Sequence, residues 1–351
     1  MLRAAILAGC MLLARTAAAQ PVDYSVEASA SFYGDNTEFF NPFREGETLI
    51  GVYGFVVGEA RTSDRLAIRA GLFGNQRFGS RDAFDEWRPV ISLVIGSRSS
   101  RLVLGTIETV RRAQGIGPDR SGPHGLLPPL QVEVLSFTRP WEAGAQWLVE
   151  TPSISHESWV NWQRVATDGQ RERFDAGAVS RFKVHRALTI GGDFHVVHDG
   201  GQLTSIGAVG ESIAGAAGGE VGGPTKHFDR VAFEAYVLGS RNVPDRAEPA
   251  RTRNGFASFL RLSAEKSNWR GHAIVYRGDD FLTREGDPNY QSIQLDGTPY
   301  RKLRDYAEGG LTKLFPLAKD SWIEGSIRGH RVEGHYEYSF RIFAVAKLRI
   351  D

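Results

Sequence analysis

Alternation of apolar and polar residues is the main pattern along the chain, and it is clearest near the C-terminal end. From Tyr338 to Ile350 every second residue is apolar, and the residues between them include Arg341, Lys347 and Arg349. Successive side chains of a β-strand point to opposite faces, so one face of this segment is wholly apolar and the other carries cations. Such a strand is expected where one face contacts lipid and the other a water-filled lumen.

The same alternation recurs along the chain and predicts many strands. In 173–184 and 187–198 apolar positions alternate with charged ones, and the tight connection His185-Arg186 between them indicates a β-hairpin. The pattern predicts an all-β chain, an antiparallel transmembrane β-barrel of about sixteen strands within a range of roughly 14 to 18. The expected strands are residues 23–33, 47–60, 65–74, 87–97, 100–109, 144–151, 156–165, 173–184, 187–198, 208–218, 228–240, 254–264, 269–278, 303–316, 321–332 and 336–350.

The lengths of the connections favour a membrane barrel over a soluble sandwich. Short gaps, as at 98–99 and 185–186, mostly alternate with long ones, as at 110–143 and 279–302. Outer-membrane barrels have short periplasmic turns and longer external loops, whereas a sandwich has no reason to sort its loops in this way. No internal repeat or domain boundary interrupts the pattern, so residues 20–351 are expected to form one barrel domain.

Residues 1–19 have the pattern of a secretory signal peptide. Arg3 precedes an apolar stretch, and Ala17-Ala18-Ala19 supplies small residues before the expected cleavage. Cys10 lies inside this segment, so the mature chain is expected to have no cysteine, and hence no disulfide and no thiolate metal site. The predicted location is the cell outer membrane, reached after secretion.

Charge and residue spacing narrow the function. The formal net charge is +1 at pH 7, without the strong basic excess that nucleic-acid binding needs. The histidines form no spacing typical of a zinc site, and Ser153, Ser155 and His156 are near each other only along the chain. We therefore expect no enzymatic activity, no catalytic residue, no metal site and no cofactor.

At the level of architecture, the chain resembles the sixteen-stranded general porins of Gram-negative outer membranes. The resemblance covers the whole mature length and rests on strand number and loop alternation, not on a motif. In those porins the long segment after the fifth strand folds into the barrel and narrows it, and the gap 110–143 takes that place here. An ordinary surface loop is the alternative. The candidate constriction residues are Arg111, Arg112, Asp119, Arg120 and Glu133.

Assignment of faces by alternation places a set of charged residues in the lumen. Cations outnumber anions in this set, which predicts a mild preference for anions, unless opposite charges pair across strands. The tryptophans lie near strand ends, where an interfacial girdle explains them, and sugar stacking in the lumen is the alternative. The candidate pore-lining residues are Arg69, Arg181, Lys183, Asp193, Glu234, Arg261, Arg270, Glu324, Arg328, Arg341, Lys347 and Arg349.

Three functions are compatible with such a barrel. The leading hypothesis is an outer-membrane pore for small polar solutes, anions among them. The alternatives are a duct for polysaccharide export and a structural or adhesive barrel with a plugged lumen. The expected partners are outer-membrane lipid, the barrel assembly machinery, and small polar solutes or polysaccharide, with no nucleic acid; self-association as a homo-oligomer is left open. The segments Glu38–Glu47 and Trp159–Gln163 stand out as signatures without an assigned role.

Overall fold

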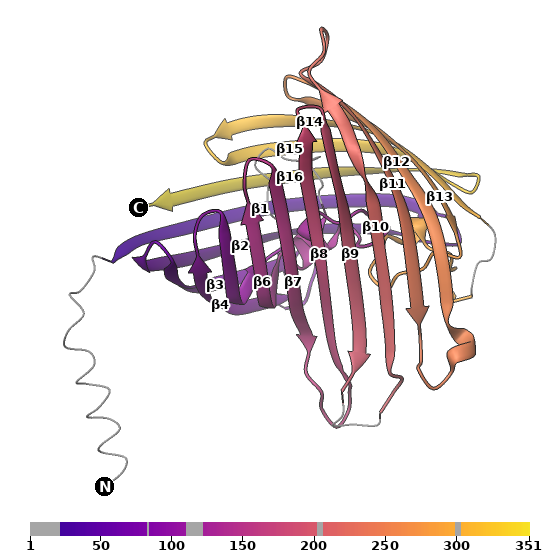
Figure 1. Ribbon diagram of the computed structural model, residues 1–351, viewed down its shortest axis with the longest axis horizontal. Coiled ribbons are helices and arrows are strands. Elements are labelled where there is room, and N and C mark those ends of the chain that lie inside the picture. The colour runs from indigo at the N-terminus through magenta and orange to yellow at the C-terminus, as the bar shows by residue number, and fades with distance from the viewer. Residues whose placement is uncertain (1–21, 83, 110–121, 202–205, 299–302) are drawn as a thin grey trace.

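The strands with the alternating pattern hydrogen-bond to one another in chain order and form a closed barrel. The computed structural model describes residues 22–82, 84–109, 122–201, 206–298 and 303–351. Within these ranges sixteen strands pair antiparallel, each with its neighbours in the chain, and β1 (Asp23–Phe40) closes onto β16 (His335–Ile350) (Figure 1). The predicted antiparallel barrel of about sixteen strands is confirmed.

The two rims of the barrel differ in their connections. The strand ends near the two chain termini lie at one rim, where Val26 pairs with Ile350, and the connections there are short; we call it the short-turn rim. The opposite, long-loop rim carries the connections 109–140 and 280–303. The other elements are β2 (Glu45–Ser63), β3 (Leu66–Arg77), β4 (Glu86–Gly96), β5 (Ser100–Glu108), η1 (Pro123–Gly125), α2 (Leu135–Thr138), β6 (Trp141–Glu150), β7 (Ile154–Arg164), β8 (Glu172–His185), β9 (Leu188–Gly200), β10 (Gly210–Gly223), β11 (Arg230–Val243), η2 (Pro249–Arg251), β12 (Arg253–Lys266), β13 (Trp269–Asp279), η3 (Pro288–Tyr290), β14 (Arg304–Ala318) and β15 (Ser321–Val332).

Several strands run further toward the long-loop rim than the sequence predicts. The prediction of a loop over 34–46 is wrong for residues 34–40 and 45–46, because β1 continues to Phe40 and β2 begins at Glu45. Asp35 and Thr37 are buried on the inner face of this extension. Their polarity suggests a loop, but both residues belong to a strand and face the lumen. β10, whose small side chains give the weakest alternation, pairs with both β9 and β11.

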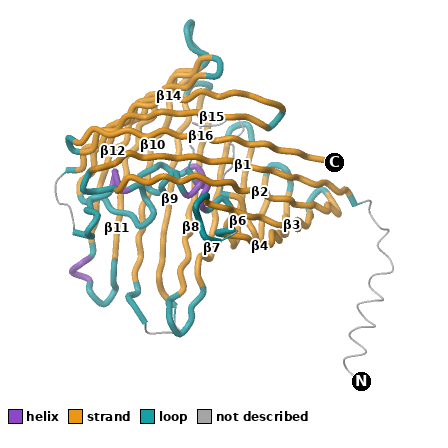
Figure 2. Tube along the Cα trace, turned by 180° about the vertical axis from the view of Figure 1, so that it is seen from behind, coloured by secondary structure: helices purple, strands orange, loops and turns teal. Residues whose placement is uncertain are grey.

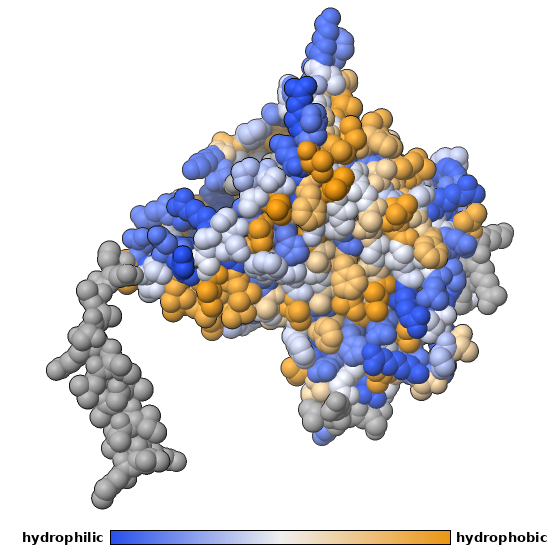
Figure 3. Space-filling view, viewed as in Figure 1, coloured by the Kyte–Doolittle hydropathy of each residue, from blue (hydrophilic) through white to orange (hydrophobic). Residues whose placement is uncertain are grey.

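Apolar side chains cover the outer wall of the barrel. Leu72, Val237 and Ile342, on three different strands, are 51%, 67% and 52% exposed. In water so much apolar surface would drive association, whereas in a bilayer it contacts lipid. Figure 3 shows apolar residues along the wall and hydrophilic residues gathered at the loop ends. Among the described residues, no helix combines the length and hydropathy needed to cross a membrane.

Arginine on the outer wall should destabilise the barrel more than arginine inside it. Ile342 lies in the middle part of β16 and faces outward, so Ile342→Arg places a charge in hydrocarbon, at a cost of about 2 to 4 kcal/mol. Ser29 lines an internal cavity, and Ser29→Arg should cost much less because the arginine stays in a polar space. Urea unfolding in lipid vesicles measures both losses. Equal losses would contradict this assignment of faces.

Loops from the long-loop rim fold into the barrel and fill its interior there (Figure 2). We call residues 122–140 and 280–292 the plug. The plug side chains Leu127, Phe137 and Phe281 are at most 2% exposed and belong to clusters that include wall residues such as Phe259 and Tyr276. Backbone hydrogen bonds also join the two plug segments to each other. Near this rim the described lumen is therefore a packed core.

Candidate functional site

Two polar networks lie in the lumen, one that joins the plug to the wall and one on the wall itself. The first, the Glu285 network, combines plug residues with lumen-facing residues of β6 to β9. The second, the Ser339 network, lies on β14, β15 and β16. Both are buried, so each polar atom in them needs a partner inside the protein.

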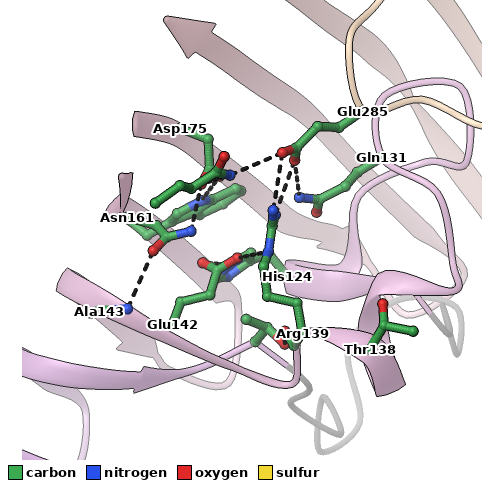
Figure 4. A network of polar contacts seen from close by, with 12 residues as sticks. His124, Gln131, Thr138, Arg139, Glu142, Ala143, Asn161, Asp175 and Glu285 are labelled. Carbon is green, nitrogen blue, oxygen red and sulfur yellow. Dashed lines mark hydrogen bonds and ion pairs between the residues drawn. The ribbon is translucent and has the colours of Figure 1, made fainter. Parts of the chain in front are cut away.

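Glu285 of the plug accepts hydrogen bonds from several segments. Arg139 donates two bonds to its carboxylate at 3.0 Å and Gln131 donates one at 3.0 Å (Figure 4). Gln163 of β7 donates a further bond at 2.9 Å. One carboxylate thus ties both plug segments to the wall. Burial alone would raise the pKa of Glu285, but the charge and hydrogen bonds of Arg139 outweigh burial and hold that pKa well below its usual value.

Asp175 of β8 lies beside Glu285. The ligand atoms of Asp175, His195 and Glu285 lie within 4.8 Å of one another, a spacing that a metal ion could bridge. Each carboxylate oxygen of Asp175 and Glu285 already accepts a hydrogen bond from at least one N–H group. Arg139 supplies the positive charge, so these groups satisfy one another within the protein. The donors to Asp175, at 2.7 to 3.3 Å, are Trp159, Asn161, Gln163 and His195.

His124 anchors the start of the plug. Its ring stacks on Trp159 with centroids 3.8 Å apart, and its nitrogens contact Glu157 at 2.5 Å and Glu142 at 3.1 Å. Burial opposes a charged ring, but the two carboxylates outweigh burial and raise the pKa of His124 to about 10. At neutral pH this residue is a cation held between two anions, so its role is to fix the plug and not to accept a proton.

We expect His124 to stabilise the plug fully below about pH 6.5 and to lose this effect as the pH rises through about 10. The folded ring holds its proton more tightly than the unfolded ring, so the stabilisation is complete below the unfolded pKa and disappears above the folded one. Urea unfolding of the chain and of His124→Gln across this range measures the effect. The variant should lack this part of the pH dependence, and identical profiles would contradict the assigned role.

Three neighbouring strands bring a serine, a histidine and a carboxylate together in the Ser339 network. Ser339 Oγ lies 2.8 Å from His330 Nε2, and His330 Nδ1 lies 3.5 Å from Glu308 Oε2. The register explains their meeting, because Glu308 pairs directly with His330, and Ser339 pairs with Arg328 two positions earlier on the same strand. A nucleophile, a base and an orienting acid have this arrangement in serine hydrolases.

Tyr306 determines which nitrogen of His330 carries the proton. Its hydroxyl donates to Glu308 Oε2 at 2.6 Å and lies 2.8 Å from His330 Nδ1. Because that proton is directed at Glu308, the hydroxyl oxygen accepts the N–H of Nδ1, and Nε2 of the neutral ring is left as an acceptor. The Ser339 hydroxyl then donates to Nε2, which is the geometry that general-base activation requires.

The end of β1 and the turn that follows it cover the Ser339 network. The Phe39 ring meets His330 edge-on at 5.0 Å, and Arg44 lies over Phe39 and pairs with Asp287 of the plug at 2.6 Å. These residues and Ser339 line a cavity of about 40 Å³, which has room for about one water molecule. The segment Glu38–Glu47, which stood out in the sequence without an assigned role, therefore covers Ser339.

A larger cavity, which we call the chamber, occupies about 890 Å³ of the lumen between the plug and the short-turn rim. Its lining includes Arg98, Pro152 and Asp320 of the short turns and Thr312 of β14. As many carboxylates as cations line it, so its wall is polar without a net charge. The residues that line both the chamber and the small cavity are Pro128, Glu133, Ile274, Glu308, Arg328 and Arg341.

Most of the candidate pore-lining residues point into the lumen and pair across strands. Lys183 and Arg349 instead lie exposed at strand ends. The cross-strand pairs are Arg69 with Glu108 at 2.8 Å, Arg181 with Asp193 at 2.6 Å, Arg261 with Glu234 at 3.9 Å, Arg270 with Glu265 at 3.5 Å and Lys347 with Glu27 at 2.8 Å. The members that line the chamber are Arg261, Arg270, Glu324, Arg328, Arg341 and Lys347. Their role in solute passage stays a prediction.

Only Glu133 of the candidate constriction residues lies in the described part of the chain. It belongs to the plug and pairs with Arg328 at 2.8 Å and Arg341 at 3.3 Å. A constriction role for the segment stays a prediction. The candidates that lie outside the described residues are Arg111, Arg112, Asp119 and Arg120.

Reasoning from the sequence missed the Ser339 network. Its members come from three strands, so no local motif marks them. A signal was nevertheless present, because each of the last three strands has two polar residues spaced by two positions, which places them on one face. These residues are Tyr306 and Glu308, Arg328 and His330, and Ser339 and Arg341.

Comparison with protein families identifies a relationship over nearly the whole chain. A family model described as "Lipid A 3'-O-deacylase-type" matches residues 16–348. The chain belongs to this family. The expectation of no enzymatic activity is therefore wrong, because the deacylase-type family is a family of enzymes. No curated protein matches the chain.

Solved outer-membrane proteins share the fold of this deacylase-type barrel at low sequence identity. OmpTdeltaL8, a loop deletion mutant of OmpT from Vibrio cholerae, is 9% identical with a TM-score of 0.56, covering 94% of this chain and 100% of the other. OpdK from Pseudomonas aeruginosa is 10% identical with a TM-score of 0.54, covering 93% and 99%. OccK2 (OpdF) from the same organism, solved with glucuronate, is 11% identical with a TM-score of 0.51, covering 94% and 99%. The architectural resemblance to outer-membrane porins is confirmed as a likeness of fold.

Proposed function

We propose that this deacylase-type barrel hydrolyses acyl esters, with Ser339 as nucleophile and His330 as base. The observation that carries the proposal is the 2.8 Å contact between Ser339 Oγ and His330 Nε2, on a ring whose other nitrogen contacts Tyr306 at 2.8 Å. The family description supports the reaction class, because removal of a 3'-O-acyl group is the hydrolysis of an ester.

The reaction follows from the arrangement of these groups. Ser339 Oγ attacks the ester carbonyl carbon while its proton passes to His330 Nε2. The bond to the leaving alcohol breaks, and that alcohol takes the proton from His330. A water molecule then attacks the acyl group on Ser339, again with His330 as base, and releases the acid and the free serine. Glu308, with Tyr306, holds the ring and stabilises its charged form.

Arginine side chains next to the serine supply donors for the developing oxyanion. Arg328 and Arg341 line the same small cavity as Ser339. A guanidinium group in a site with little water stabilises negative charge on the carbonyl oxygen more strongly than it would in bulk solvent. Both groups are already held by carboxylates, Arg341 by Asp35 at 2.9 Å, so they are fixed before the reaction begins.

Covalent labelling tests the proposal directly. A fluorophosphonate probe should form a bond between its phosphorus and Ser339 Oγ, with release of fluoride, because His330 takes up the serine proton. The label should disappear in Ser339→Ala and persist in Ser326→Ala, a control that removes another buried serine of the lumen. Mass spectrometry of the labelled peptide locates the adduct. A folded protein that stays unlabelled, or that is labelled elsewhere, would remove Ser339 from this role.

Passage of small polar solutes is the second candidate function, favoured by the chamber and by the fold. The chamber is lined by charges of both signs, and the OccK2 structure with the same fold holds glucuronate, an anion. Single-channel recordings in planar bilayers test it, since a pore gives discrete conductance steps. Purified, folded protein that gives none at any voltage would exclude this candidate. Polysaccharide export, adhesion and homo-oligomerisation stay untested predictions.

A further inference from the structure

Two lysines and a tryptophan form a row across the outer wall at the short-turn rim. Lys266 ends β12, Trp269 begins β13, and these two residues are directly paired. Trp269 is also directly paired with Lys313 of β14. Directly paired residues of an antiparallel sheet point to the same face, and Trp269 is exposed on the outer wall, so all three side chains point away from the lumen. We call the three residues the rim row.

The two ammonium groups of the rim row differ from the cations of the lumen in their surroundings. Nζ of Lys313 lies over the Trp269 ring, 4.5 Å from its centre. Within the described part of the chain, neither lysine of the row forms an ion pair with a carboxylate. On the lumen face of the same two strands, Arg270 does pair with Glu265, at 3.5 Å. The carboxylate of Asp229 in the next turn instead accepts a backbone N–H, so the row has two cations without an internal anion.

Small residues continue from the rim row toward the middle of the bilayer. Gly271 and Ala273 follow Trp269 on the outer face of β13, and a Cβ added to Gly271 would have no atom of another segment nearer than 3.9 Å. On the neighbouring strands, Leu262 and Leu311 lie directly beside these two positions, and both leucines are exposed. An acyl chain can therefore lie along β13 between the two leucines, with its headgroup at the rim row.

The rim row lies at the level of the periplasmic headgroups. Barrels of this class place their short turns in the periplasm, and the row lies at the short turn between β12 and β13. A lysine at this level keeps its alkyl chain on the apolar wall and its charge among the headgroups. Adjacent strands are about 4.8 Å apart, so lysines on β12 and β14 start about 10 Å apart and both can reach one headgroup. Lysine ammonium groups donate charge-assisted hydrogen bonds to phosphate.

We propose that the rim row binds the headgroup of an anionic phospholipid in the periplasmic leaflet, with Lys266 and Lys313 on its phosphate and one acyl chain along β13. The Trp269 indole holds the Lys313 ammonium in place and contacts the glycerol region of the lipid. Two cations without an internal anion prefer a lipid with net negative charge to a zwitterionic lipid, whose own ammonium group they repel. The site binds a lipid of the surrounding membrane and does not depend on the proposed hydrolysis at Ser339.

Quenching of Trp269 fluorescence by lipids with brominated acyl chains measures binding at the rim row. The Trp269 signal is the difference between the parent protein and Trp269→Phe, both in phosphatidylcholine vesicles with increasing amounts of brominated lipid. Brominated phosphatidylglycerol should bind roughly 25-fold more tightly than brominated phosphatidylcholine, because each lysine near a membrane surface contributes about fivefold. The matched control is Trp87, exposed on the outer wall of β4 near the long-loop rim and measured with Trp87→Phe, which should show no preference.

Substitution of the lysines tests their role without removing the tryptophan that reports binding. Lys266→Gln and Lys313→Gln should each lower the preference for phosphatidylglycerol roughly fivefold, and the double variant should bind both lipids alike. Lys183→Gln removes an exposed lysine near another short turn and should leave the preference unchanged. Heat-modifiable mobility on gels verifies that each variant is folded. Equal quenching of Trp269 by both lipids in the parent protein, or an unchanged preference in the double variant, would overturn the proposal.

Discussion

Replacement of Ser339 by alanine should lower kcat for ester hydrolysis by roughly 10³- to 10⁶-fold while changing KM little. The expected loss is large because the Ser339 hydroxyl is the group that forms the acyl intermediate in the proposed reaction. His330→Ala should cause a loss of similar size, since an alanine at that position cannot take the serine proton. The double variant should lose little more, because the two residues act as one unit.

Steady-state kinetics with a chromogenic acyl ester measures these losses. Ser326→Ala is the matched control, because this serine of β15 is also buried on the lumen side of the barrel but does not belong to the Ser339 network. Its kcat should stay within about a factor of two of the parent value, as is usual for a small change away from such features. An unchanged kcat in Ser339→Ala would contradict the assigned roles. A double variant whose loss in kcat equals the product of the two single losses would also contradict them.

The barrel itself could be predicted from the sequence because a barrel strand has a simple signature. Ile342 faces lipid and Arg341 faces the lumen, so one segment shows both environments in alternate positions. The signature fails where both faces are polar or small. Asp35 and Thr37 suggest a loop, although they are the inner face of a strand, because hydropathy alone cannot distinguish a lumen-facing strand from a solvated connection.

The contents of the lumen were much less predictable. The segment after the fifth strand was expected to contribute charges, and its described part also contributes Leu126, Leu127 and Phe137 to packed clusters. These apolar residues in a long connection were a visible signal that the segment does not stay in solvent. The partner of the segment was not visible, because Glu285 is 154 positions away from Gln131, with which it bonds.

The candidate site depends on strand register, which a sequence does not specify residue by residue. Ser339, His330 and Glu308 meet only because three strands pair in one particular alignment. A shift of one residue would turn every side chain of a strand to the opposite face and separate the three groups. This explains how an enzyme family shares its fold with porins, since residues on a common barrel determine the chemistry.

Removal of the Glu285 carboxylate should have the largest effect on stability. The substitution Glu285→Ala leaves the Arg139 guanidinium buried with fewer carboxylate partners, and it removes the acceptor of Gln131 and Gln163. Loss of one partner from such a buried charged network typically costs about 3 to 5 kcal/mol in the free energy of unfolding. The cost arises from desolvation, because Gln131 is fully buried and the Arg139 side chain is 21% exposed, so water replaces the lost acceptor only in part.

Because Glu285 joins the two plug segments to each other and to β7, its loss should loosen the plug before the strands separate. We expect a lower unfolding midpoint in urea and larger conductance steps in planar bilayers than those of the parent protein. Glu248→Ala is the control: it removes a carboxylate from an exposed loop, where the pair with Arg251 contributes less than about 1 kcal/mol. If Glu285→Ala and Glu248→Ala unfold at the same midpoint and both give the conductance of the parent protein, the Glu285 network does not hold the plug in place.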